Sequence, residues 1–468
     1  MPKKKEKSPG EQLKEKLLYK KKSVFEKCED ERQAELDYAE GYKKFLDNAK
    51  TERDATKTAI AMAKEKGFAE YKFGQKVKAG DRFYYNNRGK SLYLFIIGKE
   101  NIEKGIAITA AHIDSPRLDL KANPVYEAGG MAFMKTHYYG GIKKYQWTAI
   151  PLALHGKVVL ADGTEKDVLI GEDEDDPVFY VNDILPHLGR DQAAKPLGAA
   201  IEGEQLNLLS GSIPFDKETS EGIKLNLLRL LNEKYGMTEV DFQSSELCAV
   251  PAGKARDVGL DRSLIMAYGH DDKVCAYPEI TGILSLEAPE RTVMSIIADK
   301  EETGSDGATG MKTSAFCDII SDLAKTLGKN ERIVRANSLC ISADVAAAYD
   351  PNFAYAYELN NSALINCGIA LCKYTGGGGK SSTNDASAEY VARIRRIFDG
   401  AGVVWQSAEL GKVDQGGGGT VAKFISEKNI DTVDVGVPVI SMHAPYEVIA
   451  KADLYNMHKA VVAFYNAK

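Results

Sequence analysis

The sequence predicts an α/β protein in which a β-rich segment interrupts an α/β core, and three observations support this prediction. The chain has 468 residues, which is long for a single hydrophobic core and favours more than one domain. Apolar strand-like runs alternate with helical patterns before residue 114 and again after about residue 253. Between them the segments are short and separated by turn residues. We therefore predict a core built from residues 1–114 and 253–468, with a β-rich domain over 115–252.

The first part of the core is expected to begin with helices and continue with strands. Residues 10–67 are rich in Lys, Glu and Ala, and only Gly41 and Gly67 break the helical pattern. Strands are predicted over 91–98 and 105–111. The second of these runs is apolar on both faces, which is typical of a central strand in an α/β sheet.

The middle segment is predicted to consist of short strands separated by turns. Residues 155–160 predict one strand of a small β-rich region, and turn residues lie at 161–163, 171–173 and 211–214. The acidic run 172–176 is most simply an exposed loop.

The alternation of strands and helices returns after residue 255. Strands are predicted over 263–268, 292–298, 338–343, 403–406 and 433–440. Helical spacing places one apolar face between Phe316 and Leu327, and another between Leu454 and Tyr465.

Composition excludes several classes of protein. The net charge is −6, and the only basic blocks, Lys3–Lys5 and Lys20–Lys22, are interleaved with glutamates, so a solvated helix is expected and nucleic-acid binding is not. No apolar run reaches the ~20 residues of a membrane span, and the N-terminal pattern is not that of a signal peptide. The seven cysteines are scattered, which predicts reduced thiols and a cytoplasmic location.

Five clusters of potential metal-binding side chains each follow a predicted strand. They are His112 with Asp114, Asp271 with Asp272, Glu301 with Glu302, Asp344, and His443. In open α/β sheets, ligands bind beyond the carboxyl ends of the strands, so these clusters can meet in one crevice. Taken singly, each has a simpler interpretation as a surface pair, a turn or a helix cap. Taken together, they predict a site.

The inventory of imidazole and carboxylate groups suits zinc, cobalt or manganese in a hydrolytic site. Two metals ~3.5–4 Å apart need a carboxylate that bridges them. Adjacent side chains on a strand point in opposite directions, so Glu301 and Glu302 can have different tasks: one holds a metal and the other handles protons. Two glycine-rich segments, 376–379 and 416–419, are interpreted as loops, because Tyr374 stands where a phosphate-binding loop needs glycine.

These blocks resemble the M18 metallo-aminopeptidases, the family of aspartyl aminopeptidase and vacuolar aminopeptidase I. The resemblance runs from about residue 75 to the end of the chain, and the Met-His-Ala-Pro-Tyr-Glu segment is similar to the bacterial branch. It rests on the order and context of Ala111–Leu118, the Asp271 block, Glu301–Ser305, Ser342–Asp344 with Pro351–Phe353, and Ser441–His443.

The resemblance implies a role for each residue. Asp271 would bridge two divalent metal ions, zinc or alternatively cobalt or manganese. His112 and Asp344 would complete one metal site, and Glu302 and His443 the other. Glu301 would be the general base that takes a proton from a metal-bridged water, and Asp114 would orient the His112 ring. The resemblance also implies a cis peptide bond between Asp271 and Asp272.

The same resemblance implies a zinc-peptidase-like α/β/α catalytic domain interrupted by a β-rich dimerisation domain, and a homo-oligomer, a tetrahedral dodecamer built from dimers. The expected partners are peptides with a free N-terminus, and neither nucleic acid nor a membrane. The sequence departs from eukaryotic members, which carry extra histidines in the block after Asp344, where Ala347 and Asp350 stand nearby in this chain. Either His187 corresponds to the histidine that they place in a neighbouring subunit's site, or that histidine is absent here. The preferred N-terminal residue stays open, with Lys380, Lys412 and Lys423 as possible partners of an acidic side chain.

Three functional hypotheses follow. The leading one is a cytoplasmic dinuclear metallo-aminopeptidase that takes part in peptide turnover. The second keeps the metals but changes the substrate, as in a deacylase or a carboxypeptidase. The third is a metal-stabilised scaffold without activity, against which the complete ligand set and Glu301 argue.

Overall fold

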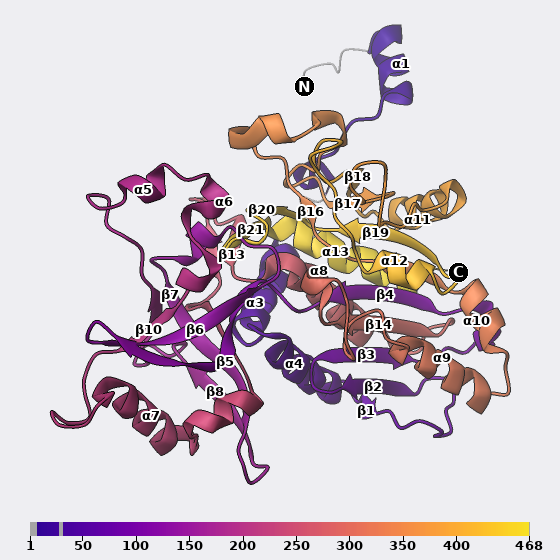
Figure 1. Ribbon diagram of the computed structural model, residues 1–468. Helices are drawn as coiled ribbons and strands as arrows, with labels where there is room; N and C mark the ends of the chain where they lie inside the picture. The colour runs from indigo at the N-terminus through magenta and orange to yellow at the C-terminus, as the bar shows by residue number, and fades with distance from the viewer. Residues whose placement is uncertain (1–6, 28–30, 468) are drawn as a thin grey trace.

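A nine-stranded mixed sheet forms the centre of the larger part of the molecule (Figure 1). The computed structural model describes residues 7–27 and 31–467, so the predicted Lys3–Lys5 block and Cys28 lie outside the described residues. Four neighbouring strands at the middle of this sheet, β14, β4, β15 and β19, are parallel. In sheet order the strands are β1 (Ala69–Glu70), β2 (Arg82–Asn87), β3 (Ser91–Ile96), β14 (Val293–Ala298), β4 (Ala107–His112), β15 (Leu339–Ser342), β19 (Asp431–Gly436), β17 (Ile369–Cys372) and β18 (Trp405–Ser407).

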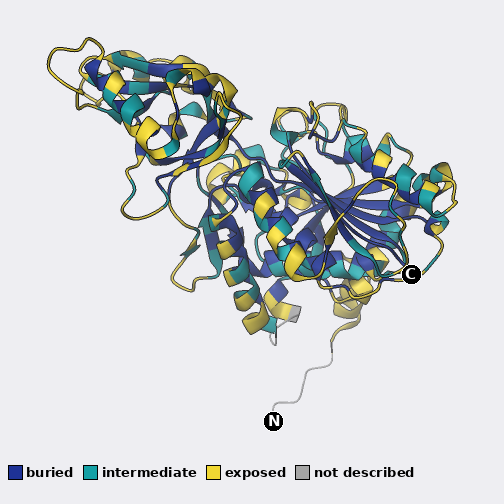
Figure 2. Cartoon of the chain, turned by 90° about the horizontal axis from the view of Figure 1, so that it is seen from below, coloured by how far each residue is buried: buried dark blue, intermediate teal, exposed yellow. Residues whose placement is uncertain are grey.

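Helices cover both faces of this sheet, which confirms the predicted α/β class. Ala107 and Ala111 of β4 belong to the hydrophobic cluster on one face, whereas Ile108 and Ala110 belong to the cluster on the other, as expected for strand alternation. The first face packs against α4 (Glu52–Glu65), α8 (His270–Leu284), α11 (Ala388–Gly400) and α13 (Lys451–Tyr465). The second packs against α9 (Ala315–Thr326), α10 (Glu331–Asn337) and α12 (Ala422–Ser426). The inner strands β3, β14, β4 and β15 are accordingly buried along their whole length, whereas the edge strand β1 is exposed, and dark strands mark the sheet centre in Figure 2.

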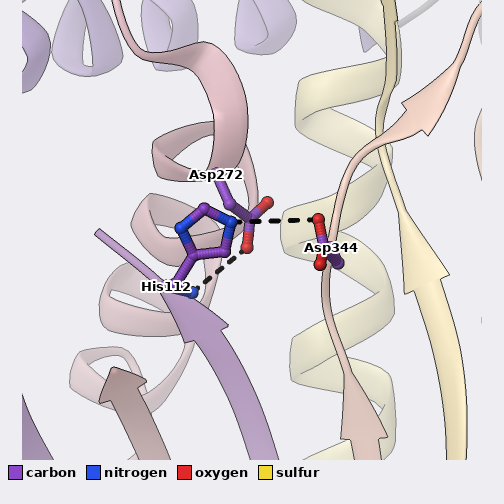
Figure 3. A group of neighbouring side chains, drawn as sticks. All are labelled: His112, Asp272 and Asp344. Atoms are coloured by element: carbon purple, nitrogen blue, oxygen red, sulfur yellow. Dashed lines mark hydrogen bonds and ion pairs between the residues drawn. The ribbon is translucent and has the colours of Figure 1, made fainter. Parts of the chain in front are cut away.

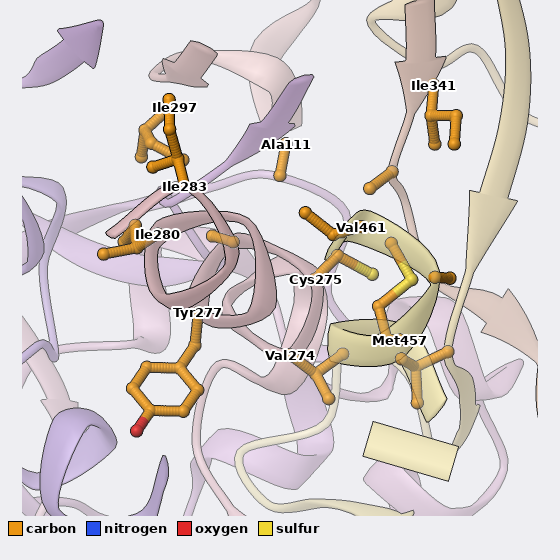
Figure 4. Packing of buried hydrophobic residues seen from close by; sticks show 14 of the residues in the cluster. Ala111, Val274, Cys275, Tyr277, Ile280, Ile283, Ile297, Ile341, Met457 and Val461 are labelled. Atoms are coloured by element: carbon orange, nitrogen blue, oxygen red, sulfur yellow. The ribbon is translucent and has the colours of Figure 1, made fainter. Parts of the chain in front are cut away.

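The contact of α8 and α13 with the parallel strands is tightly packed (Figure 4). Val274 and Ile280 of α8 and Val461 of α13 are fully buried there, beneath Ala111 and Ile341 of the sheet. Burying aliphatic side chains stabilises the fold by about 1.5–3 kcal/mol each, and this layer holds α8 under the carboxyl ends of the strands.

The N-terminal helical prediction is correct in type, and Gly67 follows the end of α4 as predicted, but Gly41 does not break a helix. The residues described in this region form four helices, α1 (Pro9–Leu17), α2 (Val24–Lys27), α3 (Arg32–Asp47) and α4, and Thr51 begins α4 with a capping box. Gly41 lies inside α3, where an added Cβ would approach the hydroxyl of Tyr277 to 2.6 Å. Gly41 is therefore a packing position and does not interrupt the helix.

Residues 117–251 contribute a separate, entirely antiparallel seven-stranded sheet, seen at the left of Figure 1. Because β11 pairs with both β5 and β7, six of the strands form a closed ring. In order the strands are β11 (Ser245–Pro251), β5 (Arg117–Ala128), β6 (Met131–Tyr139), β10 (Leu208–Gly211), β9 (Phe179–Val181), β7 (Pro151–Val159) and β8 (Glu165–Ile170). Three helices accompany them, α5 (Arg190–Ala193), α6 (Leu197–Ala200) and α7 (Gly222–Tyr235).

A third sheet of five short strands was not foreseen. Its strands are β12 (Arg256–Val258), β13 (Leu264–Ala267), β21 (Glu447–Ala450), β20 (Pro438–Ile440) and β16 (Ala346–Ala347). The single strand predicted over 433–440 is therefore wrong, because β19 ends at Gly436 and β20 enters this other sheet. Most of this stretch is apolar because both sheets bury it, and the sign of the change of sheet is Gly436 and Pro438, which lie on either side of Val437 and were not interpreted as a break.

Two predictions about the chain as a whole can also be compared with the structure. Among the described residues, no helix has both the length and the apolar character that crossing a membrane requires. The six cysteines that the structure describes are free thiols.

Candidate metal centre

Three of the predicted clusters meet at the carboxyl edge of the nine-stranded sheet. His112 is the last residue of β4, and Asp344 follows the end of β15 by two residues. Glu301 and Glu302 open a short 3-10 helix, η6 (Glu301–Thr303), just after β14. These three strands are parallel neighbours, so their ends present the side chains to the same space.

The five-stranded sheet supplies the other two clusters. Asp271 and Asp272 lie at the start of α8, directly after β13, and His443 lies in the turn after β20. The strand ends were predicted, but their membership of a second sheet was not. The peptide bond between Asp271 and Asp272 is cis, as the resemblance implies.

Asp271 stands at the centre of the assembled side chains. Its Oδ1 atom lies 3.1 Å from Nε2 of His112, and its Oδ2 atom lies 3.1 Å from Nε2 of His443. The Asp271 side chain is buried, and each of its oxygens faces a different imidazole. This is the arrangement that a carboxylate bridging two cations requires.

The remaining carboxylates divide between the two histidines. Nε2 of His112 lies 3.9 Å from Oδ1 of Asp344 and 3.9 Å from Oε2 of Glu301. Nε2 of His443 lies 3.6 Å from Oε1 of Glu302. The chain therefore brings together the side chains predicted for both metal sites.

Asp114 links His112, at the end of β4, to the start of η6. Its Oδ1 atom lies 3.4 Å from Nδ1 of His112, the ring nitrogen that faces away from Asp271. The same carboxylate accepts hydrogen bonds of 3.2 Å from the backbone amides of Glu301 and Glu302. Asp114 thus fixes the His112 ring and the start of η6 relative to each other.

Two further carboxylates belong to the site: Asp272, which stood in a predicted cluster but was given no role, and Glu447, which the sequence reasoning did not consider. Asp272 lies beside His112 and Asp344 (Figure 3), and ligand atoms of these three residues lie within 4.8 Å of one another. Its Oδ2 atom accepts a 3.3 Å hydrogen bond from the amide of His112. The pair Asp271-Asp272 was the available signal, but it does not show which side chain faces which neighbour.

Glu447 of β21 is the second of these carboxylates. Its two oxygens accept hydrogen bonds from backbone amides, 2.9 Å from Asp271 N and 2.7 Å from His443 N. It holds together the two segments that the five-stranded sheet contributes. The only sequence signal was a charged residue in the apolar strand Glu447–Ala450.

The electrostatics of the site are dominated by buried negative charge. Oδ1 of Asp271, Oδ1 of Asp272 and Oε1 of Glu302 are buried and form no hydrogen bond with the described residues, although Oδ1 of Asp271 is in ion-pair contact with Nε2 of His112 at 3.1 Å. Burial, helped by Asp114 and Asp271, raises the pKa of Glu301 to about 7. Burial alone would lower the pKa of His443, but Asp271 and Glu302 raise it to about 10.

The donor set fits divalent metal ions. A second group of atoms, from His112, Asp271 and Glu302, also lies within 4.8 Å of one another. Imidazole nitrogen and carboxylate oxygen are the donors that zinc takes in hydrolytic sites, and a cation would satisfy the unpartnered buried oxygens.

Other residues singled out from the sequence lie elsewhere. His187 is exposed in the loop after β9 and is not among the described contacts of the cluster. The two glycine-rich loops pack on each other and, with Lys380 and Lys412, line a surface cavity. Lys380 forms an ion pair with Asp385 at 3.0 Å.

Comparison with known proteins gives consistent matches over almost the whole chain. The model of the family described as aminopeptidase I zinc metalloprotease (M18) matches residues 45–465. A relative from Clostridium acetobutylicum, named "Probable M18 family aminopeptidase 1", is 47% identical over 461 residues, covering 96% of this chain and 99% of its own. The crystal structure of an M18 family aminopeptidase from Thermotoga maritima superposes with a TM-score of 0.91 at 42% identity, covering 96% of this chain and 99% of the other. A yeast mApe1 dodecamer, at 20% identity and a TM-score of 0.73 over 92% of this chain and 95% of the other, shares the fold.

Proposed function

The chain belongs to the M18 family of zinc metallo-aminopeptidases, and from this membership and the site geometry we propose a dinuclear enzyme that removes the N-terminal residue of peptides. The observation that carries the dinuclear proposal is the position of Asp271. Its two oxygens each lie 3.1 Å from a different histidine nitrogen. A carboxylate placed between two imidazoles in this way is suited to bridge two ions.

The proposed ligands form two sets that share Asp271. His112 and Asp344 complete one set, and His443 and Glu302 complete the other. Zinc is the metal we propose, with cobalt or manganese as alternatives that the same donors accept. When bound, such ions lower the pKa of water and polarise a peptide carbonyl.

Glu301 is proposed as the general base. Its carboxylate lies 3.9 Å from His112 Nε2, next to the proposed ligands, and its pKa is raised to about 7 by burial and the neighbouring carboxylates. A base is most effective when its pKa lies near the working pH. Glu301 would take a proton from the attacking water and pass it to the amine that leaves.

The excess of carboxylates also supports the choice of a free N-terminus as substrate. A protonated α-amine carries the positive charge that this group of side chains attracts, whereas an acylated amine does not. The same property disfavours a deacylase or a carboxypeptidase, whose substrates bring no cation to this position.

We propose in addition that the protein is a homo-oligomer, a tetrahedral dodecamer built from dimers through the β-rich region. The support is twofold: a dodecamer of the same fold is known, and the region exposes many large apolar side chains. They are Val178, Tyr180, Ile184, Leu185, Leu188, Leu197, Ile213 and Phe215.

The test is hydrolysis of aminoacyl substrates in matched pairs, one with a free amine and one with an acetylated amine. Each pair is assayed on the chelator-treated protein and after addition of zinc, cobalt or manganese. We expect metal-dependent cleavage of the free-amine member only, and the ranking of side chains would give the preferred N-terminal residue.

Equal cleavage of acetylated substrates, or cleavage that resists the chelator, would contradict the mechanism. Absence of cleavage over long peptides as well would favour the inactive-scaffold hypothesis. The cytoplasmic location remains a prediction.

A further inference from the structure

Three consecutive residues of the β-rich region reach the metal centre. Tyr139 ends β6 of the seven-stranded sheet, and Gly140 and Gly141 follow it. Each of the three touches a different residue of the cluster, and these partners come from three separate segments of the core. We call residues 139–141 the β6 tip.

Tyr139 contacts Asp114. Its hydroxyl donates a 2.7 Å hydrogen bond to Oδ2 of Asp114, the carboxylate that also faces His112 and the amides of η6. Both side chains are buried. The guanidinium of Arg117 lies 4.1 Å from the centre of the Tyr139 ring and is held by Glu52 at 2.8 Å, so the ring is fixed in place.

Gly141 contacts His443. The carbonyl oxygen of Gly141 accepts a 2.7 Å hydrogen bond from Nδ1 of His443. With Nδ1 carrying a hydrogen, Nε2 is the nitrogen left to bind a metal, and it points toward Asp271 and Glu302. The carbonyl therefore fixes both the tautomer and the direction of the ring.

Gly140 lies against Glu302. A Cβ atom added at this position would lie 3.0 Å from Oε2 and 3.3 Å from Cβ of Glu302, and the residue has φ +74°. The backbone conformation therefore favours glycine here, and any larger residue would press against Glu302.

We infer that the β6 tip positions the metal ligands: the Tyr139 hydroxyl orients Asp114, the Gly141 carbonyl orients His443, and Gly140 leaves the space that Glu302 needs. The inference rests on the proposed function. It gives the β-rich region a part in building the site of its own chain, separate from any part in assembly. These are positioning residues, since they act through Asp114, His443 and Glu302.

The test compares zinc affinity between matched variants of the full chain, by competition with a zinc-binding dye on metal-free protein. Gly140→Ala places a methyl group against Glu302. Its control is Gly130→Ala, at the other end of β6, where φ is +76° and an added Cβ meets nothing within 4 Å. The two positions have nearly the same φ, +74° and +76°, so the difference between the variants reports mainly the contact with the site.

A second pair covers the hydroxyl contact. Tyr139→Phe removes the donor to Asp114 and keeps the ring beneath Arg117. Its control is Tyr138→Phe, the neighbouring tyrosine, whose side chain is 41% exposed. The unfolding midpoint of each metal-free variant is measured beside its affinity, so that damage to the fold is seen separately.

We expect zinc affinity to fall about 10–100-fold in Gly140→Ala and about 10-fold in Tyr139→Phe, the range for groups that orient metal ligands, with both controls unchanged. kcat should fall in parallel. If the wild type binds zinc and each variant matches its control in affinity, the inference is wrong while the proposed function stands. If the wild type takes up no divalent metal, both are wrong.

Discussion

The molecule contains two buried clusters of histidine and carboxylate, and they differ in charge balance. In the metal centre, His112 and His443 face an excess of carboxylates, and several buried oxygens form no hydrogen bond with the described residues. The second cluster joins α4 to the seven-stranded sheet through His155. Its ring nitrogens lie 3.0 Å from Asp54 and 2.9 Å from Glu172, and Lys50 adds a further positive charge 3.6 Å from Glu172.

This difference in charge balance distinguishes a candidate metal site from a structural contact. Around His155 the two carboxylates meet two cations, and none of the described buried atoms without a partner belongs to this cluster. Such a cluster can stabilise the fold without any ligand. The metal centre holds more buried carboxyl groups than its histidines can pair, and burial raises the pKa of Asp272, Glu302 and Asp344, so a bound cation would be needed to stabilise their charged forms. A His-carboxylate cluster therefore indicates function when its charges fail to balance within the chain.

The largest expected effect is the loss of both metals in Asp271→Ala. Asp271 faces both histidines, so its removal takes a ligand from each proposed site. We expect metal content per chain, measured by elemental analysis, to fall sharply and activity to fall by more than the about 10²–10⁴-fold that loss of a general base causes. Retention of two metals per chain would show that Asp271 does not bridge them.

Glu301→Gln should separate chemistry from metal binding. We expect kcat to fall about 10²–10⁴-fold while the metal content stays near that of the wild type. A rate close to the wild type would contradict the role of Glu301 as base.

The same variant has a pH signature in the metal-free protein. The folded-state pKa of Glu301, raised to about 7, lies above its unfolded value, so the wild type loses stability as pH rises through that pKa. Glu301→Gln should therefore unfold at a higher temperature than the wild type at pH 8, and at the same temperature near pH 4. Calorimetry at the two pH values measures this.

Some residues and elements of these two clusters could be predicted from the sequence, and others could not. His112, Asp271, Glu301 and Asp344 could be predicted to meet, because each directly follows an apolar run, and strand ends in an α/β protein share one edge. The fold class followed from the same runs. In contrast, Val437 separates two sheets within one mostly apolar stretch, where hydrophobicity alone does not show the break and only Gly436 and Pro438 beside it indicate one.

Residues that act through the backbone could not be predicted. Glu447 accepts from two amides, and Gly141 contributes only its carbonyl, so side-chain chemistry leaves no spacing to recognise. The His155 cluster depends on the docking of α4 against β7, which are about 100 residues apart in the chain. Contacts of this kind come from tertiary packing, and the local pattern does not contain them.

The smallest expected effect is that of His155→Gln, and it should be the reverse of the effects at the metal centre. Burial alone would lower the pKa of His155, but Asp54 and Glu172 raise it, so the protonated ring stabilises the fold. Because the folded-state pKa exceeds the unfolded value, this contribution is fully present below about pH 6.5 and is lost as pH rises through the raised pKa. At pH 6 we expect the variant to lose about 2 kcal/mol of unfolding free energy, as for hydrogen bonds between charged groups, with kcat and metal content unchanged. The deficit should shrink at alkaline pH, where the wild-type ring also loses its charge. A deficit that is independent of pH would mean that the ring stabilises this junction by packing alone, and a loss of metal would mean that the two clusters are coupled.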